Sequence, residues 1–365
     1  MCQMSKLLPI FLLVFFSTSL LFSQAKYSNE FLTIGVGARA QAMSNAVVAN
    51  VNDVTAGYWN PAGLVEIEAP FQVMAMHSEL FAGIAKYDYL GIAKPLNKEK
   101  KSTIGVSLIR LGIDNIPNTL NLVGADGSIN YDNITEFSAA DYALFLSYGR
   151  ELREGLNVGG SVKVIRRVIG TFGSAWGFGI DLGLKYKVKN WKFGVMGRDI
   201  TSTFNAWSFN STEQQRAVFI QTGNDILESS VEITRPRIIL SAAWSKTLGE
   251  KFNLLIEGDF DFTTDGQRNV LISSKSINID PHAGFEVGYK NFIFLRGGVM
   301  NFQQIKFNAG DDRTYLSVQP NFGLGIKFGN LTIDYAYTNI GNVSEVLYSN
   351  IFSLKLDFKS KESIE

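Results

Sequence analysis

Residues 176–187 read WGFGIDLGLKYK, and along this stretch large apolar side chains alternate with small or charged ones. A period of two places the two kinds on opposite faces of a β-strand. The apolar face runs for about ten residues, the usual length of a membrane-crossing strand, with Trp176 at one end and Tyr186 at the other. A soluble β-sandwich also alternates, but a face of this length bracketed by aromatics is typical of a strand that meets lipid.

The same alternation recurs from about residue 71 almost to the C-terminus. It predicts an all-β fold, a transmembrane antiparallel β-barrel of about fourteen strands, and an even count is usual for bacterial barrels made of one chain. The predicted strands cover residues 71–78, 86–95, 102–111, 139–149, 156–169, 174–187, 191–199, 236–246, 252–262, 282–290, 292–300, 318–328, 331–338 and 350–358.

The connections between these strands differ in length in an ordered way. Those after even-numbered strands are short, whereas most of those after odd-numbered strands are long, at 112–138, 200–235, 263–281, 301–317 and 339–349. Outer-membrane barrels have short periplasmic turns and long external loops. The pattern therefore predicts that the first strand begins on the periplasmic side.

The composition argues against several other classes of protein. The chain of 365 residues has 34 Lys and Arg against 34 Asp and Glu, so it lacks the basic excess of a nucleic-acid binder. It has only two histidines, His77 and His282, and no metal-binding, phosphate-binding or dinucleotide motif. Ser78 adjoins His77, but neighbours on a strand point to opposite faces. The sequence therefore predicts a protein that is not an enzyme and that has no cofactor and no metal site.

The N-terminus has the pattern of an export signal at residues 1–25. Lys6 precedes an apolar run that reaches about Phe22, and Ser23-Gln24-Ala25 then offers a small-x-small cleavage site. The alternative is a single anchoring helix. Cys2, the one cysteine, precedes the apolar run instead of following it, which argues against a lipoprotein anchor and would leave the mature chain without cysteine. We expect cleavage near residues 23–25 and export to the outer membrane.

Residues 26–70 form a different segment, rich in small and turn-forming residues and without long alternation. We expect it to pack inside the barrel of residues 71–358 as a plug, with an exposed linker as the alternative. Asn60-Pro61 predicts a rigid bend that is either an ordinary turn or a hinge. Arg39 is expected to pair with an inward acid, because an unpaired charge in a narrow lumen is costly. The candidate acids are Asp181, Glu257, Asp259, Glu286 and Asp334.

Other charged and aromatic residues bear on the use of the lumen and loops. Mixed charges on the inner face suit a plugged polar lumen better than an ion-selective pore; they are Lys163, Asp181, Lys185, Glu257, Asp259, Glu286 and Lys327. Trp207, Phe209 and Phe219 in the loop 200–235 dock a partner, line a ligand mouth or pack down as a lid. The tail 359–365 is polar, and no role follows from it.

Two N-terminal stretches resemble a known family. Residues 31–40, FLTIGVGARA, and 56–64, AGYWNPAGL, are similar to the N-terminus of the PorV/PorQ family, outer-membrane barrels of Bacteroidetes-type bacteria that are distantly similar to the FadL long-chain fatty-acid transporters. The resemblance implies a fourteen-stranded barrel with an N-terminal hatch. The hatch motif would consist of Gly37, Ala38, Arg39, Ala40, Asn60, Pro61, Ala62 and Gly63. Residues 42–46 read AMSNA where family members often read GMGGA, which makes the chain look like a paralogue.

Two functions follow as hypotheses. The first, implied by the PorV branch of the family, is a non-enzymatic binding or assembly component linked to type IX protein secretion, with the translocon or its cargo as partner. The alternative is a FadL-like transporter or channel for hydrophobic small molecules, which requires an apolar pocket beneath the long loops and a lateral opening or inward kink in the wall. A purely structural barrel, with neither of these functions, stays open as a further class. Outer-membrane lipid is an expected partner in each case.

Overall fold

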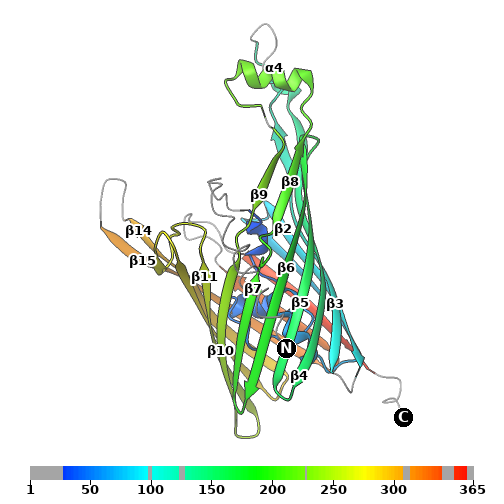
Figure 1. The fold of residues 1–365 in the computed structure, drawn as a ribbon, viewed down its shortest axis with the longest axis vertical. Coiled ribbons are helices and arrows are strands. Elements are labelled where there is room, and N and C mark those ends of the chain that lie inside the picture. The colour runs from blue at the N-terminus through cyan, green and yellow to red at the C-terminus, as the bar shows by residue number, and fades with distance from the viewer. Residues whose placement is uncertain are drawn as a thin grey trace, which may run out of the picture.

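A closed antiparallel β-barrel forms the body of the computed structural model (Figure 1), which describes residues 28–97, 101–122, 128–226, 228–306, 313–338 and 349–359. The predicted signal at 1–25 lies outside the described residues, as does the tail beyond residue 359. The barrel closes because β1 (Phe71–Leu80) pairs with both β2 (Ala85–Asn97) and β17 (Ser349–Phe358). In an open sheet each of the two edge strands would have one unpaired side, and closure pairs these sides with each other.

The other strands follow one another around the wall. They are β3 (Ser102–Asn118), β4 (Thr135–Arg153), β5 (Leu156–Ile169), β6 (Gly173–Val188), β7 (Trp191–Arg198), β8 (Phe204–Phe209), β9 (Ser230–Ile233), β10 (Arg237–Leu248), β11 (Phe252–Thr263), β12 (Ile272–Ser273), β13 (Asn278–Tyr289), β14 (Ile293–Lys306), β15 (Thr314–Phe328) and β16 (Leu331–Thr338). The helical segments are η1 (Glu30–Leu32), α2 (Ala38–Ala42), α3 (Ala56–Trp59), η2 (Pro61–Glu66), η3 (Tyr131–Asn133) and α4 (Glu213–Gln221).

Three of these strands do not add members to the wall. β8 continues β7 along the same neighbour, β6, and β9 pairs with β8 just as β10 pairs with β7. β12 is a two-residue strand beside β13. The wall is therefore a closed barrel of fourteen strands, which confirms the predicted fold and count. Each predicted strand overlaps one member of this wall.

The long connections are more regular than predicted. β3 and β4 extend as a hairpin into the segment predicted as the loop 112–138, and β8, α4 and β9 occupy much of the predicted loop 200–235. Figure 1 shows β8, β9 and α4 projecting beyond the end of the barrel. The lipid-facing alternation ends where a strand leaves the membrane, whereas hairpin pairing needs no apolar outer face. The prediction therefore ended these strands too early.

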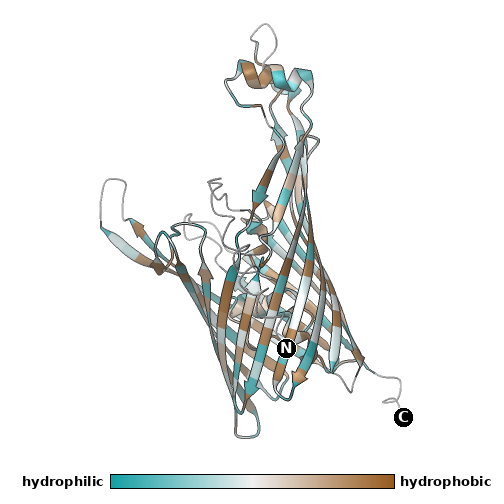
Figure 2. Cartoon of the chain, viewed as in Figure 1, coloured by the Kyte–Doolittle hydropathy of each residue, from teal (hydrophilic) through white to brown (hydrophobic). Residues whose placement is uncertain are grey.

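The outer and inner faces of the wall have the predicted polarity. On β6 the outward side chains of Trp176 and Leu182 are 59% and 51% exposed, whereas Asp181 and Lys185 are buried inside. Hydrophobic residues recur along the strands in Figure 2. Among the described residues, none of the helices has both the length and the apolar character needed to cross a membrane.

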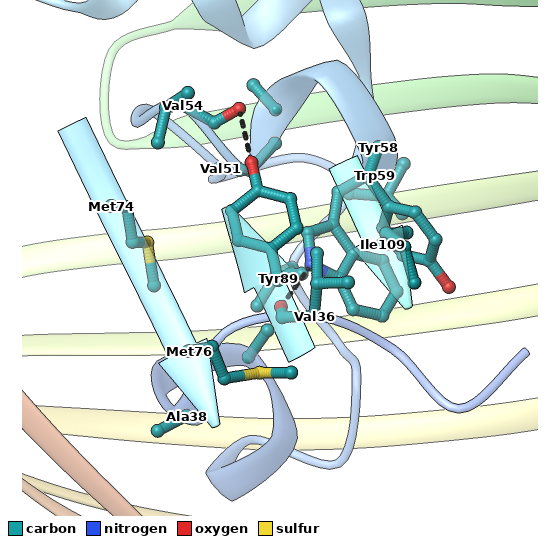
Figure 3. Packing of buried hydrophobic residues seen from close by; sticks show 14 of the residues in the cluster. Val36, Ala38, Val51, Val54, Tyr58, Trp59, Met74, Met76, Tyr89 and Ile109 are labelled. Atoms are coloured by element: carbon teal, nitrogen blue, oxygen red, sulfur yellow. Dashed lines mark hydrogen bonds between the residues drawn. The ribbon is translucent and has the colours of Figure 1, made fainter. Parts of the chain in front are cut away.

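The hydrophobic core lies between the N-terminal segment and the inner wall. In Figure 3, Val36, Tyr58 and Trp59 of this segment pack beside Met76 and Tyr89 of β1 and β2. The Trp59 indole Nε1 donates a hydrogen bond to the Val36 carbonyl at 2.9 Å, and the Tyr89 hydroxyl donates to the Val54 carbonyl at 3.2 Å. The N-terminal residues thus pack against the inner face of the wall, and Figure 1 draws them in blue inside the barrel.

Candidate functional site

The N-terminal segment is joined to the wall by a buried chain of charges. Arg39 of α2 places Nε 2.8 Å from Glu286 Oε2 on β13. Arg296 on β14 bonds the same carboxylate at 2.6 Å and Asp334 on β16 at 2.7 Å. Burial lowers the pKa of Arg39, but the Glu286 carboxylate and other acids raise it by more, so the guanidinium stays charged. The predicted pairing of Arg39 with an inward acid is confirmed, and Glu286 is the partner.

The small residues around Arg39 let the backbone approach the wall closely. The Gly37 N–H donates to Met76 Sδ at 3.0 Å, and the Ala38 N–H donates to Ser353 Oγ at 2.7 Å. A Cβ added at Gly323 of β15 would lie 2.5 Å from Ala42 Cβ. Ala40 is buried in the same contact. Larger side chains in this stretch would push α2 away from the wall.

Two carboxylates on β11 hold the next turn of the segment. Asp259 Oδ2 accepts hydrogen bonds from the Val47 and Val48 N–H groups, each at 3.1 Å. Glu257 Oε1 accepts from the Ala49 N–H at 2.7 Å and the Asn50 N–H at 3.2 Å. Successive backbone N–H groups thus point at two buried acidic side chains. Turns with several N–H groups on one side commonly bind acidic groups in this way.

Asn60-Pro61 forms the bend that the sequence predicts. Asn60 Oδ1 accepts from the Ala62 N–H at 3.2 Å, and Pro61 starts η2, where no N–H is needed. Asn60 Nδ2 also donates to the Val48 carbonyl at 3.1 Å and to the Leu184 carbonyl of β6 at 3.2 Å. The motif therefore fixes both its own turn and its place on the wall.

Glycines of the wall make room for this bend. A Cβ at Gly183 would lie 2.0 Å from Asn60 Oδ1, and one at Gly159 would lie 2.4 Å from the Pro61 carbonyl carbon. Within the segment, a Cβ at Gly63 would lie 2.4 Å from the Val51 carbonyl oxygen. Only residues without a side chain fit at these three positions as the chain is folded.

Glu66 ties the end of η2 to the short-turn side of the barrel. Its two carboxylate oxygens lie 2.6 Å from Lys185 Nζ and 2.7 Å from Lys192 Nζ. Burial raises the pKa of Glu66, but the two lysines lower it by more, so the pKa is below its usual value. Glu66 is therefore an anion at neutral pH.

Among the described residues, the largest register shift along the wall lies between β7 and β8, and we call it the break. Residues 198–203 face only residues 179–181 of β6, because Gly197 pairs with Leu182 and Phe204 with Phe178. Asp199 and Ser202 have positive φ angles of 54° and 57°, which turn the chain out of the strand path. The sequence prediction missed this break, although the predicted strand 191–199 ended beside it.

The break is fastened from inside the barrel. Lys163 Nζ on β5 lies 2.8 Å from Asp181 Oδ1 and 2.6 Å from Asp199 Oδ1. The Asp199 N–H also donates to Asp181 Oδ1 at 2.7 Å, and the Thr203 hydroxyl donates to Asp199 Oδ1. Thr203 and Lys163 both lie close to Gly179. A Cβ added at Gly179 would lie 2.8 Å from Lys163 Cε, so the site has no room for a side chain. The charged groups thus hold Asp199 and Thr203 on the inner side of the wall, whereas Ile200 between them is exposed.

A small cavity with a mixed polar and apolar lining lies on the inner side of this break. Its volume is about 40 Å³, room for about one water molecule. Arg198 lines it, with its guanidinium 4.4 Å from the Tyr58 ring centroid and 5.2 Å from that of Trp59. Asp199 and Arg237 also line it. Leu32 and Phe145 lie in the same lining, so the cavity is partly charged and is smaller than the apolar pocket that the transporter hypothesis requires.

The predicted loop residues lie in the projecting hairpin. Trp207 is only 7% exposed and stacks on Phe209, with ring centroids 5.4 Å apart. The Arg167 guanidinium lies 5.1 Å from the Trp207 ring. Phe219 is half-buried on α4, whereas Ile220 beside it is 68% exposed. Of the alternatives, Trp207 and Phe209 fit packing better than an exposed contact.

The two histidines do not come together. His77 is exposed on the outer wall, with Nδ1 2.6 Å from Asp88 Oδ1, whereas Ser78 is buried on the inner face. His282 lies inside, with Nδ1 3.1 Å from the Ser44 carbonyl oxygen. His77 and Ser78 point to opposite faces, as predicted.

No protein-family model matches the chain, and no curated protein matches it. Solved structures do resemble it. The toluene transporter TodX of Pseudomonas putida has 16% identity and a TM-score of 0.55, over 89% of this chain and 99% of that chain. The toluene transporter TbuX of Ralstonia pickettii has 12% identity and a TM-score of 0.53, over 89% and 98%. A FadL homologue of Pseudomonas aeruginosa has 12% identity and a TM-score of 0.53, over 88% and 98%.

Proposed function

We propose that this chain is a non-enzymatic outer-membrane channel for small hydrophobic molecules, with the N-terminal segment as its gate and the break at residues 199–203 as its side exit. The break carries the proposal, because a regular barrel wall offers no lateral path and this one is interrupted beside a lumenal cavity. The FadL-like fold supports it, since similar barrels are described as toluene transporters. Export through a signal removed near residues 23–25 is part of the proposal.

The gate must move for anything to pass. Residues 28–67 pack inside the barrel, and the cavity beside the break is too small for an aromatic hydrocarbon. The motif Gly37–Ala40 and Asn60–Gly63 seats the gate in this proposal, because several of these residues contact the wall directly. Passage in this proposal requires that part of this seat separates from the wall, which enlarges the cavity behind Asp199 and Thr203.

A disulfide that joins α3, next to the seat, to the wall tests the proposal. A Cβ at Gly57 of α3 would lie 3.3 Å from Ser147 Cβ on β4, close to the separation of about 3.8 Å in a disulfide. The double variant Gly57→Cys, Ser147→Cys should oxidise readily and slow the entry of toluene into liposomes that contain the protein. Reduction should restore the rate. The two single-cysteine variants are the matched controls.

The outcome separates a moving gate from a fixed plug. Equal toluene entry through the oxidised and reduced protein would show that α3 need not move and would remove the gate from the proposal. Entry no faster than through protein-free liposomes, in the wild-type chain, would overturn the channel itself. A polar solute of similar size serves as the comparison, because it should not follow the lateral path.

The binding or assembly role linked to type IX secretion is the second candidate. It is favoured by the hairpin of β8, α4 and β9, which stands clear of the barrel and carries exposed Ile220. The test is an affinity purification of the tagged protein from its native membrane in mild detergent. Recovery of secretion or cargo proteins that depends on residues 210–229 would favour this role over transport.

A further inference from the structure

Four lysines lie on three neighbouring turns at the short-turn end of the barrel. Lys189 lies in the turn between β6 and β7, Lys246 and Lys251 flank the turn between β10 and β11, and Lys290 lies in the turn between β13 and β14. All four are exposed. We call these four residues the lysine arc.

The lysine arc is held together by the backbone. The Ser245 N–H donates to the Asn190 carbonyl at 2.9 Å, which joins the first turn to the second. The Lys290 N–H donates to the Lys251 carbonyl at 2.6 Å, which joins the second to the third. The positive charges therefore lie along one continuous sector of the rim, at positions fixed by the fold.

The charge of this sector is not balanced locally. The whole chain has equal numbers of basic and acidic residues, but Glu250 is the only acid in residues 189–191, 246–252 and 289–293. No ion pair joins the lysine arc to an acid within the part of the chain that the structure describes. The turn between β4 and β5 differs, because there Arg150 and Arg153 alternate with Glu151 and Glu154.

Aromatic side chains lie directly beside the lysine arc on the outer wall. Trp191, Phe252 and Tyr289 are 47%, 46% and 38% exposed. The rings of Phe252 and Tyr289 lie 5.1 Å apart, and Lys290 Nζ is 5.6 Å from the Tyr289 ring centroid. Exposed aromatic residues at a barrel end mark the level of the lipid headgroups. Lysines beside such a belt reach headgroup phosphates with their flexible side chains.

We propose that the lysine arc is a binding surface for anionic phospholipid headgroups in the leaflet at the short-turn end. Charge complementarity selects this partner, since an unbalanced row of ammonium groups at headgroup level favours a lipid with net negative charge over a zwitterionic one. The surface is separate from the lumen and does not depend on the proposed transport. It would fix the height and tilt of the barrel in the bilayer.

Native mass spectrometry of the purified full chain tests this proposal, with phosphatidylglycerol and phosphatidylcholine in equal amounts. Wild type should retain phosphatidylglycerol in preference. Each lysine removed should lower the preference by about fivefold, so the variant Lys246→Gln, Lys251→Gln, Lys290→Gln should have little left. The matched control is Arg150→Gln, Arg153→Gln, at the same end but beside balancing acids, and it should keep most of the preference. Lysine-to-arginine variants should keep it too.

Two results would overturn the proposal. One is an unchanged preference in the triple variant, with unchanged melting to show that it is folded. The other is a wild-type preference that does not weaken when salt is raised from 0.05 to 0.5 M, since screening must weaken binding between exposed charges. The salt series needs no variant, so it decides the question even if the triple variant fails to fold.

Discussion

Arg39 Nε and Glu286 Oε2 lie 2.8 Å apart, and this pair joins the N-terminal segment to the far wall of the barrel. Glu286 also pairs with Arg296, which bonds the same oxygen at 2.6 Å. Arg296 in turn pairs with Asp334. The segment is therefore anchored to a network that the wall would possess without it. Loss of Arg39 should loosen the gate more than it disrupts the barrel.

Arg39→Ala should lower the stability of the folded barrel by about 1–3 kcal/mol, less than for an isolated buried pair, since Arg296 still neutralises Glu286. The measurement is thermal melting in detergent together with heat-modifiable gel mobility. Glu286→Ala, which strips a partner from both arginines, should cost more. Wild-type melting and wild-type gel mobility in Arg39→Ala would show that the pair has no stabilising role.

Asn60 and Gly183 should behave as a coupled pair. Gly183→Ala alone should be destabilising, because its Cβ would lie 2.0 Å from Asn60 Oδ1. Asn60→Ala alone should cost about 1–3 kcal/mol, since the Ala62 N–H loses its acceptor and the Val48 carbonyl loses its donor. The double variant should be more stable than the sum of the two changes predicts. Melting of the four proteins of this cycle measures the coupling, and strict additivity would contradict the contact.

Glu66 should make stability depend on pH in acid. Its pKa in the folded chain lies below the usual value because Lys185 and Lys192 outweigh the effect of burial. A lowered carboxylate pKa contributes stability that is complete above about pH 5 and is lost as the pH falls through the folded pKa. The melting temperature of Glu66→Gln should therefore lie below that of wild type at pH 7, and the gap should narrow toward pH 3. A constant gap across this range would exclude Glu66 as the titrating group.

Strand positions followed from the sequence because lipid imposes a rule on each residue. In residues 176–187 every outward position must be apolar, so the period of two is visible without any partner strand. The pairing of Arg39 was also predictable in kind, since a buried charge requires a counter-charge. The choice of Glu286 among five acids was not, because it depends on where α2 meets the wall.

The break at residues 199–203 was hidden for a related reason. Its residues obey no periodic rule, and they are held by groups far away in the sequence, Lys163 and Asp181. The hairpin of β8 and β9 was missed because, beyond the membrane, strands lack the lipid-facing alternation. A sequence pattern shows whether a strand face is in contact with lipid. It shows little about contacts between inward side chains that are far apart in the sequence.

Lys163→Met should release the break. It removes the ammonium group that bonds both Asp181 and Asp199, and the loss of this bonded partner from two buried carboxylates should cost about 3–5 kcal/mol. Asp199 and Thr203 should then be held less tightly against β6, where the hydrogen bond from the Ile200 N–H to the Ile180 carbonyl would remain. In liposomes, toluene entry should rise above that of wild type while a polar solute of similar size gains less.

A neutral triad, Lys163→Met with Asp181→Asn and Asp199→Asn, serves as the companion when the single variant assembles poorly. It removes the repulsion between the acids, and an asparagine at 181 still accepts the hydrogen bond from the backbone N–H of residue 199. Its stability should exceed that of Lys163→Met, but the break should remain weakly held. Unchanged toluene entry in both proteins, with the fold verified by gel mobility, would mean that the break is a rigid part of the wall and not an exit.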